Sequence, residues 1–319
     1  MNRHATAPEI TPDHQAAASR ARLGVIYGVT AYGLWGVFPV YFKAIESVPT
    51  LEVLAHRIIW SVVFLLLLIM LRGGMREVRQ AVKSRRTLLT LCATTCLIAC
   101  NWGLFIWAVA NDKLLQSALA YFINPLISVM LGFVFLRERL RAWQSFSVAL
   151  ATVAVVFLTI SSGALPIIAL IMACTFGMYG LLRKTAQVEA LAGLTIETGL
   201  LAPIALIFLI HEMVQGRAVF AAQSLQFDLL LIAAGVVTAV PLLWFAQAAR
   251  RLRLATLGFL QYLAPTGHFL LAVLVYGEAF PTTHLIAFIV IWIALLIYSI
   301  DTAFSTRPPP AGPPTPAIE

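Results

Sequence analysis

Charged residues are scarce in this 319-residue chain: Asp, Glu, Lys and Arg together make up 11% of it, whereas hydrophobic residues make up 61%. A soluble domain of this size carries far more polar surface, so the balance excludes a soluble globular protein. The apolar runs are continuous and do not alternate with polar residues, which excludes a membrane β-barrel. The sequence therefore predicts an all-α protein that spans a membrane several times.

The motifs of ATP-driven transport and of common metal sites are also missing. No GxxxxGK[ST] phosphate loop occurs. His211 and Glu212 begin like a zinc-protease helix, but the second histidine of that motif is absent. Cys92, Cys96 and Cys100 share one face of an expected helix, and small residues at a helix contact explain them better than a metal or redox site. We assign no cofactor and no catalytic group, so the sequence does not favour an enzyme.

Ten apolar segments are each long enough to cross a bilayer core of about 30 Å as a helix. They lie near residues 23–43, 52–71, 88–110, 114–136, 142–160, 165–182, 193–210, 226–249, 254–276 and 283–303. Most connections are short, so consecutive helices are expected to be antiparallel neighbours. Residues 1–22 and 304–319 are polar, Ala-rich or Pro-rich, and we expect them to be disordered tails.

The basic residues predict how the chain is oriented. In alternate connections, 18 of the 22 Lys and Arg fall on the side that also holds both termini, and Lys43, Lys113 and Arg217 fall on the other side. Basic residues are enriched in cytoplasmic loops, so both termini are predicted to be cytoplasmic. The formal charge of +8 is thereby explained without a nucleic-acid partner. The remaining basic residue, Arg57, falls inside a predicted span.

An offset of 140 residues relates the two halves of the chain. It lays Pro125 on Pro265 and Glu138 on Glu278, and both halves share the order of a basic turn, a helix with proline, and a final glutamate. The two predicted repeats cover residues 23–160 and 161–303. Because each repeat has five helices, an odd number, the second would be inverted, and in such proteins the substrate site lies near the bilayer midplane.

Several long stretches resemble a known family. They are AYGLWGVFPVYFK, LAHRIIWS, NWGLFIWAV, ALAYFINPL and FLRERL in the first half, and LPIIAL, YGLLRK, RLRLATLGFLQYLAPT and VYGEAF in the second. They resemble the EamA-type branch of the drug/metabolite transporter superfamily and, within it, the RarD subfamily, named for chloramphenicol sensitivity. The resemblance implies a ten-helix permease of the bacterial-type inner membrane with inverted repeats. Its partners would be the lipid bilayer and a small-molecule substrate, and neither that substrate nor the oligomeric state is implied.

Arg57 has two interpretations, because a charge at the bilayer centre costs on the order of 3 kcal/mol and is usually partnered. The offset of 140 places Arg57 on Glu197, a position of opposite charge. In the first interpretation, Arg57 binds an anionic or polar group and Glu197 carries a proton or a cationic group during transport. In the second, the two belong to a buried ion pair or network that holds the halves together. His56 could couple transport to protons or be a satisfied histidine of the bundle.

The two related helices that contain Pro125 and Pro265 each carry polar residues on one face. These residues are Ser117, Tyr121, Asn124 and Ser128 on the first helix, and Gln261 and His268, with Tyr262 beside them, on the second. Such faces predict the walls of one water-accessible cavity, because proline frees backbone carbonyls there. Hydrogen bonds between helices, at about 0.6 kcal/mol each, are the alternative.

Further candidates for the pocket are aromatic and amide residues in other helices: Tyr32, Trp35, Asn101, Trp102 and Gln247. Aromatic rings beside glycines favour a pocket for aromatic or amphipathic solutes. Ordinary glycine-mediated packing is the alternative for each of these residues.

The predicted function is a secondary transporter of small organic metabolites or drugs, which works by alternating access around a midplane cavity. Glu138 and Glu278 end their helices at opposite membrane faces, where each would serve as a gate or a structural clamp. A proton is the preferred coupling ion, and uncoupled movement fits equally well. A non-transporting membrane interaction or sensor protein is the alternative, although the longest loops, 72–87 and 211–225, are short for such a role.

Overall fold

Ten helices in the described part of the chain are long and apolar enough to cross a membrane, as the sequence predicts. The structure is a computed structural model that describes residues 12–111, 114–161, 167–277 and 282–305, and no strand occurs in these ranges. The spans are α1 (Pro12–Ala44), α2 (Thr50–Arg72), α4 (Arg85–Ala110), α5 (Leu114–Leu136), α6 (Ala142–Ser161), α7 (Ile167–Thr185), α8 (Ala190–Val214), α9 (Leu225–Arg251), α10 (Leu254–Gln261) continued by α11 (Leu263–Leu270), and α12 (Thr282–Ser305). The chain is therefore an all-α multi-pass membrane protein.

Two helical segments lie outside the predicted spans. α1 begins at Pro12, eleven residues before the expected start, so the second half of the expected N-terminal tail is helical. Proline is well tolerated in the first turn of a helix, and alanines follow it, which explains this extension. The short α3 (Met75–Lys83) fills the basic connection between α2 and α4, with Ala81 buried and Arg79 exposed.

The two prolines of the related helices act differently. Pro125 lies inside α5, which stays continuous. Pro265 lies just after the break between α10 and α11 at Tyr262, and a π-helical segment, η1 (Leu271–Val275), continues the span. Proline has no N–H for the helical hydrogen bond, which fits a break there. The carbonyl of Pro125 instead makes close contact with Gly258 of α10, where an added Cβ would lie 2.8 Å from the oxygen.

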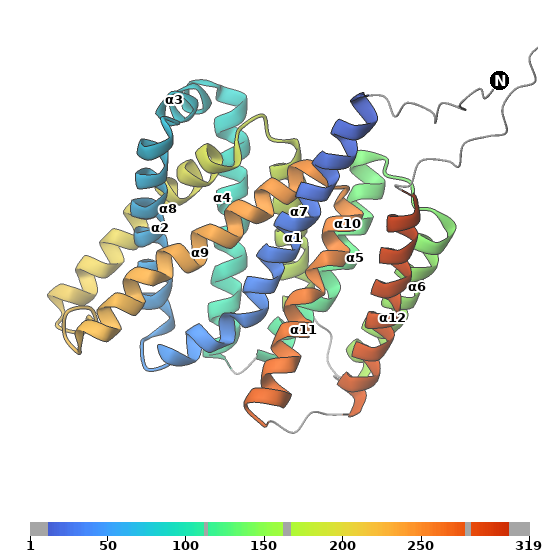
Figure 1. The fold of residues 1–319 in the computed structure, drawn as a ribbon. Coiled ribbons are helices and arrows are strands. Elements are labelled where there is room, and N and C mark those ends of the chain that lie inside the picture. Colours follow the sequence, from blue (N-terminus) through green and yellow to red (C-terminus); the bar gives the residue numbers. More distant parts are fainter. Residues whose placement is uncertain (1–11, 112–113, 162–166, 278–281, 306–319) are drawn as a thin grey trace, which may run out of the picture.

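The helices pack in pairs that join the two halves of the sequence (Figure 1). α1 packs against α9 and α11, α2 against α8 and α9, α4 and α5 against α7, α5 against α10, and α6 against α12. The pairs α2 with α8, α5 with α10 and α6 with α12 each join helices at equivalent places in the two proposed repeats. The repeat itself stays a prediction.

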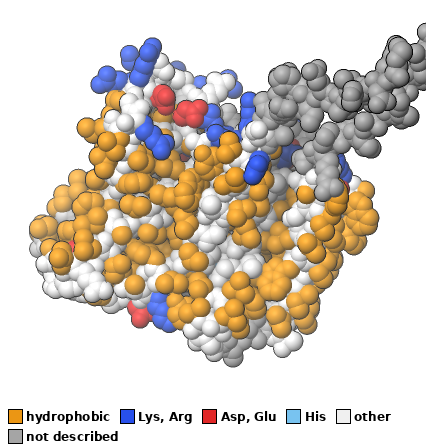
Figure 2. Space-filling view, viewed as in Figure 1, with side chains coloured by type: hydrophobic (Ala, Val, Ile, Leu, Met, Phe, Trp, Pro, Cys, Tyr) orange, Lys and Arg blue, Asp and Glu red, His pale blue; other side chains and the backbone are white. Residues whose placement is uncertain are grey.

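The outer surface is divided into an apolar waist and one basic edge. Figure 2 shows hydrophobic side chains over most of the molecule, while Lys and Arg gather at the edge that carries α3. Leu66, Leu67, Ile204 and Ile207 are among the large apolar side chains exposed on this waist. Such exposure is what a bilayer requires of the lipid-facing side of a helix.

Helices approach most closely at glycines. A Cβ added to Gly235 of α9 would lie 2.2 Å from the carbonyl carbon of Trp60 in α2. A Cβ added to Gly267 of α11 would lie 2.7 Å from the Cα of Gly36 in α1. These contacts bring the helices of the two halves together around the site described next.

Candidate functional site

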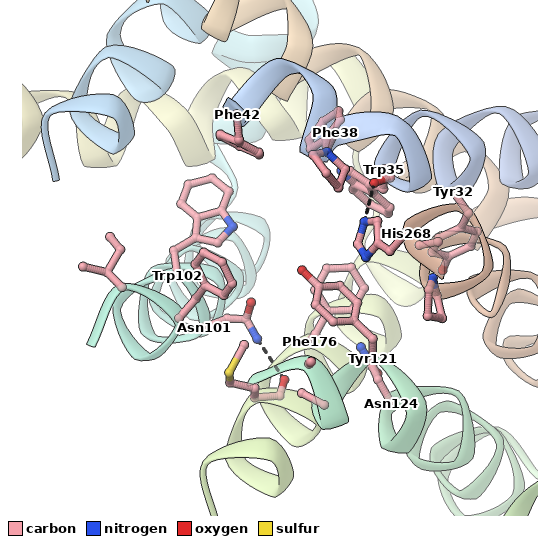
Figure 3. Close-up of a pocket in the computed structure, with 18 of the residues that line it drawn as sticks. Tyr32, Trp35, Phe38, Phe42, Asn101, Trp102, Tyr121, Asn124, Phe176 and His268 are labelled. Atoms are coloured by element: carbon pink, nitrogen blue, oxygen red, sulfur yellow. Dashed lines mark hydrogen bonds between the residues drawn. The ribbon is translucent and has the colours of Figure 1, made fainter. Parts of the chain in front are cut away.

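A cavity of about 720 Å³ lies among the helices of both halves. This volume falls within the usual range of pockets for small organic ligands, roughly 300–1,000 Å³. Eleven of its 34 lining residues are Phe, Trp or Tyr, about three times their share of the whole chain, 11%. Residues that line it, many of them drawn in Figure 3, include Tyr32, Trp35, Phe38, Phe42, Arg57, Asn101, Trp102, Tyr121, Asn124, Phe176, Thr238, Gln261, Pro265 and His268.

The cavity reaches the surface at the edge opposite α3. Its lining extends to Glu46 and Thr50, which are exposed in and beside the connection between α1 and α2. Figure 1 places this connection at the far end of the bundle from α3. The cavity is therefore open at that edge.

Arg57 projects from α2 into the cavity and is held there by neighbours from three other helices. Its Nε donates a hydrogen bond of 2.8 Å to Oγ1 of Thr238 in α9. Its guanidinium carbon lies 5.4 Å from the ring centroids of both Phe42 and Trp102, which are cation–π distances. No described carboxylate lies within ion-pair distance of Arg57, and Glu197 is not its partner.

The described polar groups of α4, α5 and α11 that were predicted for the cavity line it, except Ser128, which packs against Gly258. Nδ2 of Asn101 donates to the carbonyl of Met172, at 2.8 Å. Figure 3 shows the Tyr121 hydroxyl directed into the space between Trp102 and Trp35. Tyr121 and Asn124, from the predicted polar face on α5, thus lie in the cavity wall, while the Ser117 side chain lies outside the described residues.

His268 joins α11 to α1 at the cavity wall. Its Nε2 lies 2.9 Å from the carbonyl oxygen of Trp35, and since a carbonyl can only accept, this nitrogen carries the proton. The Tyr121 ring packs edge-on against the imidazole at a centroid distance of 5.7 Å. Gln261 lines the cavity nearby, as predicted, and is buried.

Four other predicted residues lie elsewhere. Tyr262 is buried behind the wall and donates to the carbonyl of Phe122, at 3.2 Å. Gln247 bonds Arg251 and does not line the cavity. His56 faces away from the cavity and packs on Phe220, with its Nε2 3.9 Å from Glu52.

The fourth of these residues, Glu197, belongs to a buried network on the closed side of the cavity. Its carboxylate accepts hydrogen bonds from Thr94, at 2.6 Å, and from Tyr179, at 3.2 Å. It also pairs with Arg183 of α7, at 3.4 Å, and both side chains are nearly inaccessible. Gly193 leaves room for this guanidinium, because an added Cβ would lie 2.1 Å from its Nη1. The sequence alone does not predict this role of Arg183, because the residue follows the predicted span 165–182 and is grouped with the basic residues of a connection.

The network reaches the cavity through aromatic rings. The Tyr179 ring stacks on Phe245, with centroids 5.8 Å apart, and lies 5.9 Å from Phe176. Phe176 itself lines the cavity, so one ring separates Tyr179 from that space. The four-residue spacing from Tyr179 to Arg183, which places both on one helix face, is the sequence signal for this cluster.

Glu138 closes the bundle at the edge that carries α3. Arg137 ends α5 in a left-handed turn, with φ of 53°, and the Glu138 N–H then bonds the carbonyl of Gly132, at 3.0 Å. The folded-back carboxylate accepts the backbone N–H groups of Leu254 and Ala255, at 2.7 and 3.1 Å. These are the first residues of α10, so Glu138 caps that helix and joins the two halves.

Basic side chains complete this closure through backbone oxygens. Lys184 donates to the carbonyls of Ala249, at 3.3 Å, and Leu252. Arg253 donates to the carbonyl of Arg139. Glu138, predicted as a gate or a structural clamp, thus joins the halves through backbone N–H groups, and Glu278 lies outside the described residues.

Comparison with known proteins adds family information. The model of the EamA-like transporter family matches residues 22–160. The chain is 46% identical to an uncharacterized transporter of Vibrio cholerae, over 92% of this chain and 95% of that protein. It is 43% identical to Protein RarD of Escherichia coli, over 91% and 98% of the two chains.

Two more distant proteins are also similar to this chain. The chain is 33% identical to the chloramphenicol-sensitive protein RarD of Pseudomonas aeruginosa, over 88% of this chain and 94% of that protein. A solved crystal structure with 18% sequence identity is similar with a TM-score of 0.68, over 88% of this chain and 98% of the other. At that identity the likeness concerns the fold alone.

Proposed function

Because this chain belongs to the RarD subfamily of the EamA-like transporter family, and is a membrane transporter, we propose that it carries small organic solutes through the described cavity as a secondary transporter. The observation that carries the proposal is the cavity itself. It is large enough for a small organic solute, lined by both halves of the bundle, open at one edge and closed by Glu138 at the other.

The described conformation is the outward-open state in this proposal. The basic edge that carries α3 would face the cytoplasm, following the positive-inside rule, and both termini would lie on that side of the bacterial inner membrane. The cavity then opens to the external side, at Glu46 and Thr50.

Alternating access would come from rocking of the two proposed repeats, residues 23–160 and 161–303, about the cavity. Glu138 serves as the cytoplasmic gate in this scheme, because its carboxylate belongs to the first repeat and the N–H groups of Leu254 and Ala255 to the second. Opening on the cytoplasmic side would separate these partners. The same cycle accounts for export of a solute and for exchange of one solute for another.

A gradient would drive the cycle, and a proton is the coupling ion that we favour. Glu197 is the candidate carrier, since its network lies one ring away from the cavity on the closed side. His268, in the cavity wall, is the second candidate, whereas His56 lies away from it. Proton uptake by Glu197 would release Arg183, which links titration to the packing of α7 against α8.

The test is flux in liposomes that contain the purified protein, with and without a proton gradient. Labelled amino acids, organic anions and aromatic drugs, including chloramphenicol, form the panel. Ala272→Trp fills the cavity, and Ala93→Trp places the same side chain on the exposed face of α4 as a matched control.

We expect solute movement with the native protein and with Ala93→Trp, and its loss with Ala272→Trp at an unchanged Tm. We also expect Glu197→Gln to remove the effect of the proton gradient. Equal flux through both Trp variants would refute the cavity as the path. A gradient effect that survives in Glu197→Gln would refute coupling through that carboxylate.

A further inference from the structure

The cavity contains very few charges for a space that both halves of the bundle line. Among the described residues that line it, Arg57 and Glu46 are the two Asp, Glu, Lys or Arg side chains. Glu46 is exposed at the mouth, where water screens it, whereas Arg57 lies between α2 and α9 with its Nε bonded to Thr238. Inside the cavity, the field is therefore that of a single cation.

The Arg57 guanidinium is fixed and has donors to spare. Thr238 takes the Nε hydrogen, and the rings of Phe42 and Trp102, each 5.4 Å away, restrict the planar group. Four further N–H groups remain on the two Nη atoms, which have no described hydrogen-bond partner. An intramembrane arginine normally has an anionic or carbonyl partner. No described carboxylate is within reach, so the site lacks an anion.

The walls next to Arg57 are aromatic. Trp102 borders the guanidinium, Tyr121 points its hydroxyl into the same space, and Trp35 lies across from them with Phe176 against it at 6.0 Å (Figure 3). A ligand whose anionic group lies on Arg57 would place the rest of its structure among these rings. Offset and edge-on contacts favour an aromatic group there over an aliphatic one.

The number of cationic side chains in the cavity also limits the charge of the anion that it can bind. One arginine balances one negative charge, and its fork matches the two oxygens of a carboxylate. A phosphate carries up to two charges near neutral pH, and the described part of the lining holds no second Lys or Arg to balance them. A monovalent carboxylate therefore fits better than a phosphate ester.

We propose that the cavity binds small aromatic monocarboxylates, with the carboxylate on Arg57 and the ring between Trp102, Tyr121 and Trp35. This inference rests on the proposed function, and it names the substrate class of the same site. The positive charge of Arg57 would repel amines, and uncharged aromatic compounds would leave its N–H donors without a partner.

Four probes of matched shape distinguish the contribution of the carboxylate to binding from that of the aromatic ring. They are 3-phenylpropionate, 3-phenylpropionamide, 3-phenylpropan-1-amine and 3-cyclohexylpropionate. Their binding to the full-length protein in nanodiscs is measured by titration calorimetry. We expect 3-phenylpropionate to bind at least tenfold more tightly than the amide or the amine, and severalfold more tightly than the cyclohexyl acid. Equal binding of the amide or the amine, or binding of none of the four, would overturn the inference.

Variants then assign the preference to Arg57. Arg57→Gln should bring the carboxylate and the amide to equal affinity, while Arg57→Lys, which keeps the charge without the fork, should retain part of the difference. Arg217→Gln removes an exposed cation outside the cavity lining and should change nothing. A carboxylate preference that persists in a folded Arg57→Gln protein would overturn the assignment.

Counterflow in liposomes separates this inference from the proposed function. Transport of the amine or the amide without transport of the acid would leave the transporter intact and overturn the carboxylate class. Tight binding of the acid with no counterflow of any solute would retain the site and refute transport through it.

Discussion

In the proposed cycle, replacing Glu138 by glutamine should favour opening of the transporter at the edge that carries α3. Glutamine keeps the shape of the side chain and removes the charge, while the native carboxylate accepts two N–H groups at the start of α10. Hydrogen bonds to charged groups contribute about 1.5–3 kcal/mol each, and the amide oxygen retains part of one. A loss of about 2 kcal/mol from the closed state raises a minor cytoplasm-open population roughly 30-fold.

Cysteine labelling measures that population. In a protein without its four native cysteines, Ser128→Cys places a thiol in the contact between α5 and α10, where Ser128 is buried against Gly258. A membrane-impermeant maleimide added to inside-out vesicles reaches this thiol from the cytoplasmic side. The labelling rate should follow the open population and rise by about the same factor of 30 in Glu138→Gln.

Glu189→Gln is the matched control at the same edge. Glu189 pairs with Arg250 at 3.0 Å, but its side chain is 55% exposed, and surface ion pairs contribute about 0–1 kcal/mol. Its labelling rate should change by no more than about fivefold. An unchanged labelling rate in Glu138→Gln would refute the role of Glu138 as a gate.

Three other expectations concern packing and access. Arg183→Met should destabilise the protein by about 3 kcal/mol or more because Glu197 is left as a buried unpaired charge, and the double variant with Glu197→Gln should recover part of the Tm. Gly235→Ala should lower the Tm markedly because the new methyl would meet the backbone of α2, whereas Gly33→Ala, with open space around it, should leave the Tm unchanged. Gln261→Cys, in the protein without native cysteines, should react with aqueous maleimide from the open side, and an inert thiol would contradict its place in the cavity wall.

Hydropathy predicts the spans because every helix that crosses a bilayer must be apolar along most of its length. The span expected at residues 114–136 coincides with α5, which is uncharged along its whole length. The early start of α1 and the short α3 were missed, since their polar residues carry no hydropathy signal. The early start of α1 depends on helix propensity, and α3 also packs against α8 and α4.

The sequence predicts which residues line the cavity better than it predicts which side chains pair with one another. Tyr121, Asn124 and His268 stood out as polar groups on apolar helices, and all three line the cavity. The partner of Glu197 was not predictable in the same way. Arg183 is buried because Gly193, on a different helix, leaves space for it, and this kind of complementarity exists only in the folded chain.

The buried pair of α7 and α8 also bears on how the chain enters the membrane. Arg183 and Glu197 stand on consecutive helices, 14 residues apart, and each would carry an unpaired charge if its helix were inserted alone. Translocon scales assign roughly 2.5–3.5 kcal/mol to a charge at the centre of a helix and less to one near its end, where Arg183 lies. A hairpin that enters as one unit brings both charges into lipid already paired. The ion pair that holds the mature bundle together thus favours joint insertion of α7 and α8 during synthesis, before the remaining helices are complete.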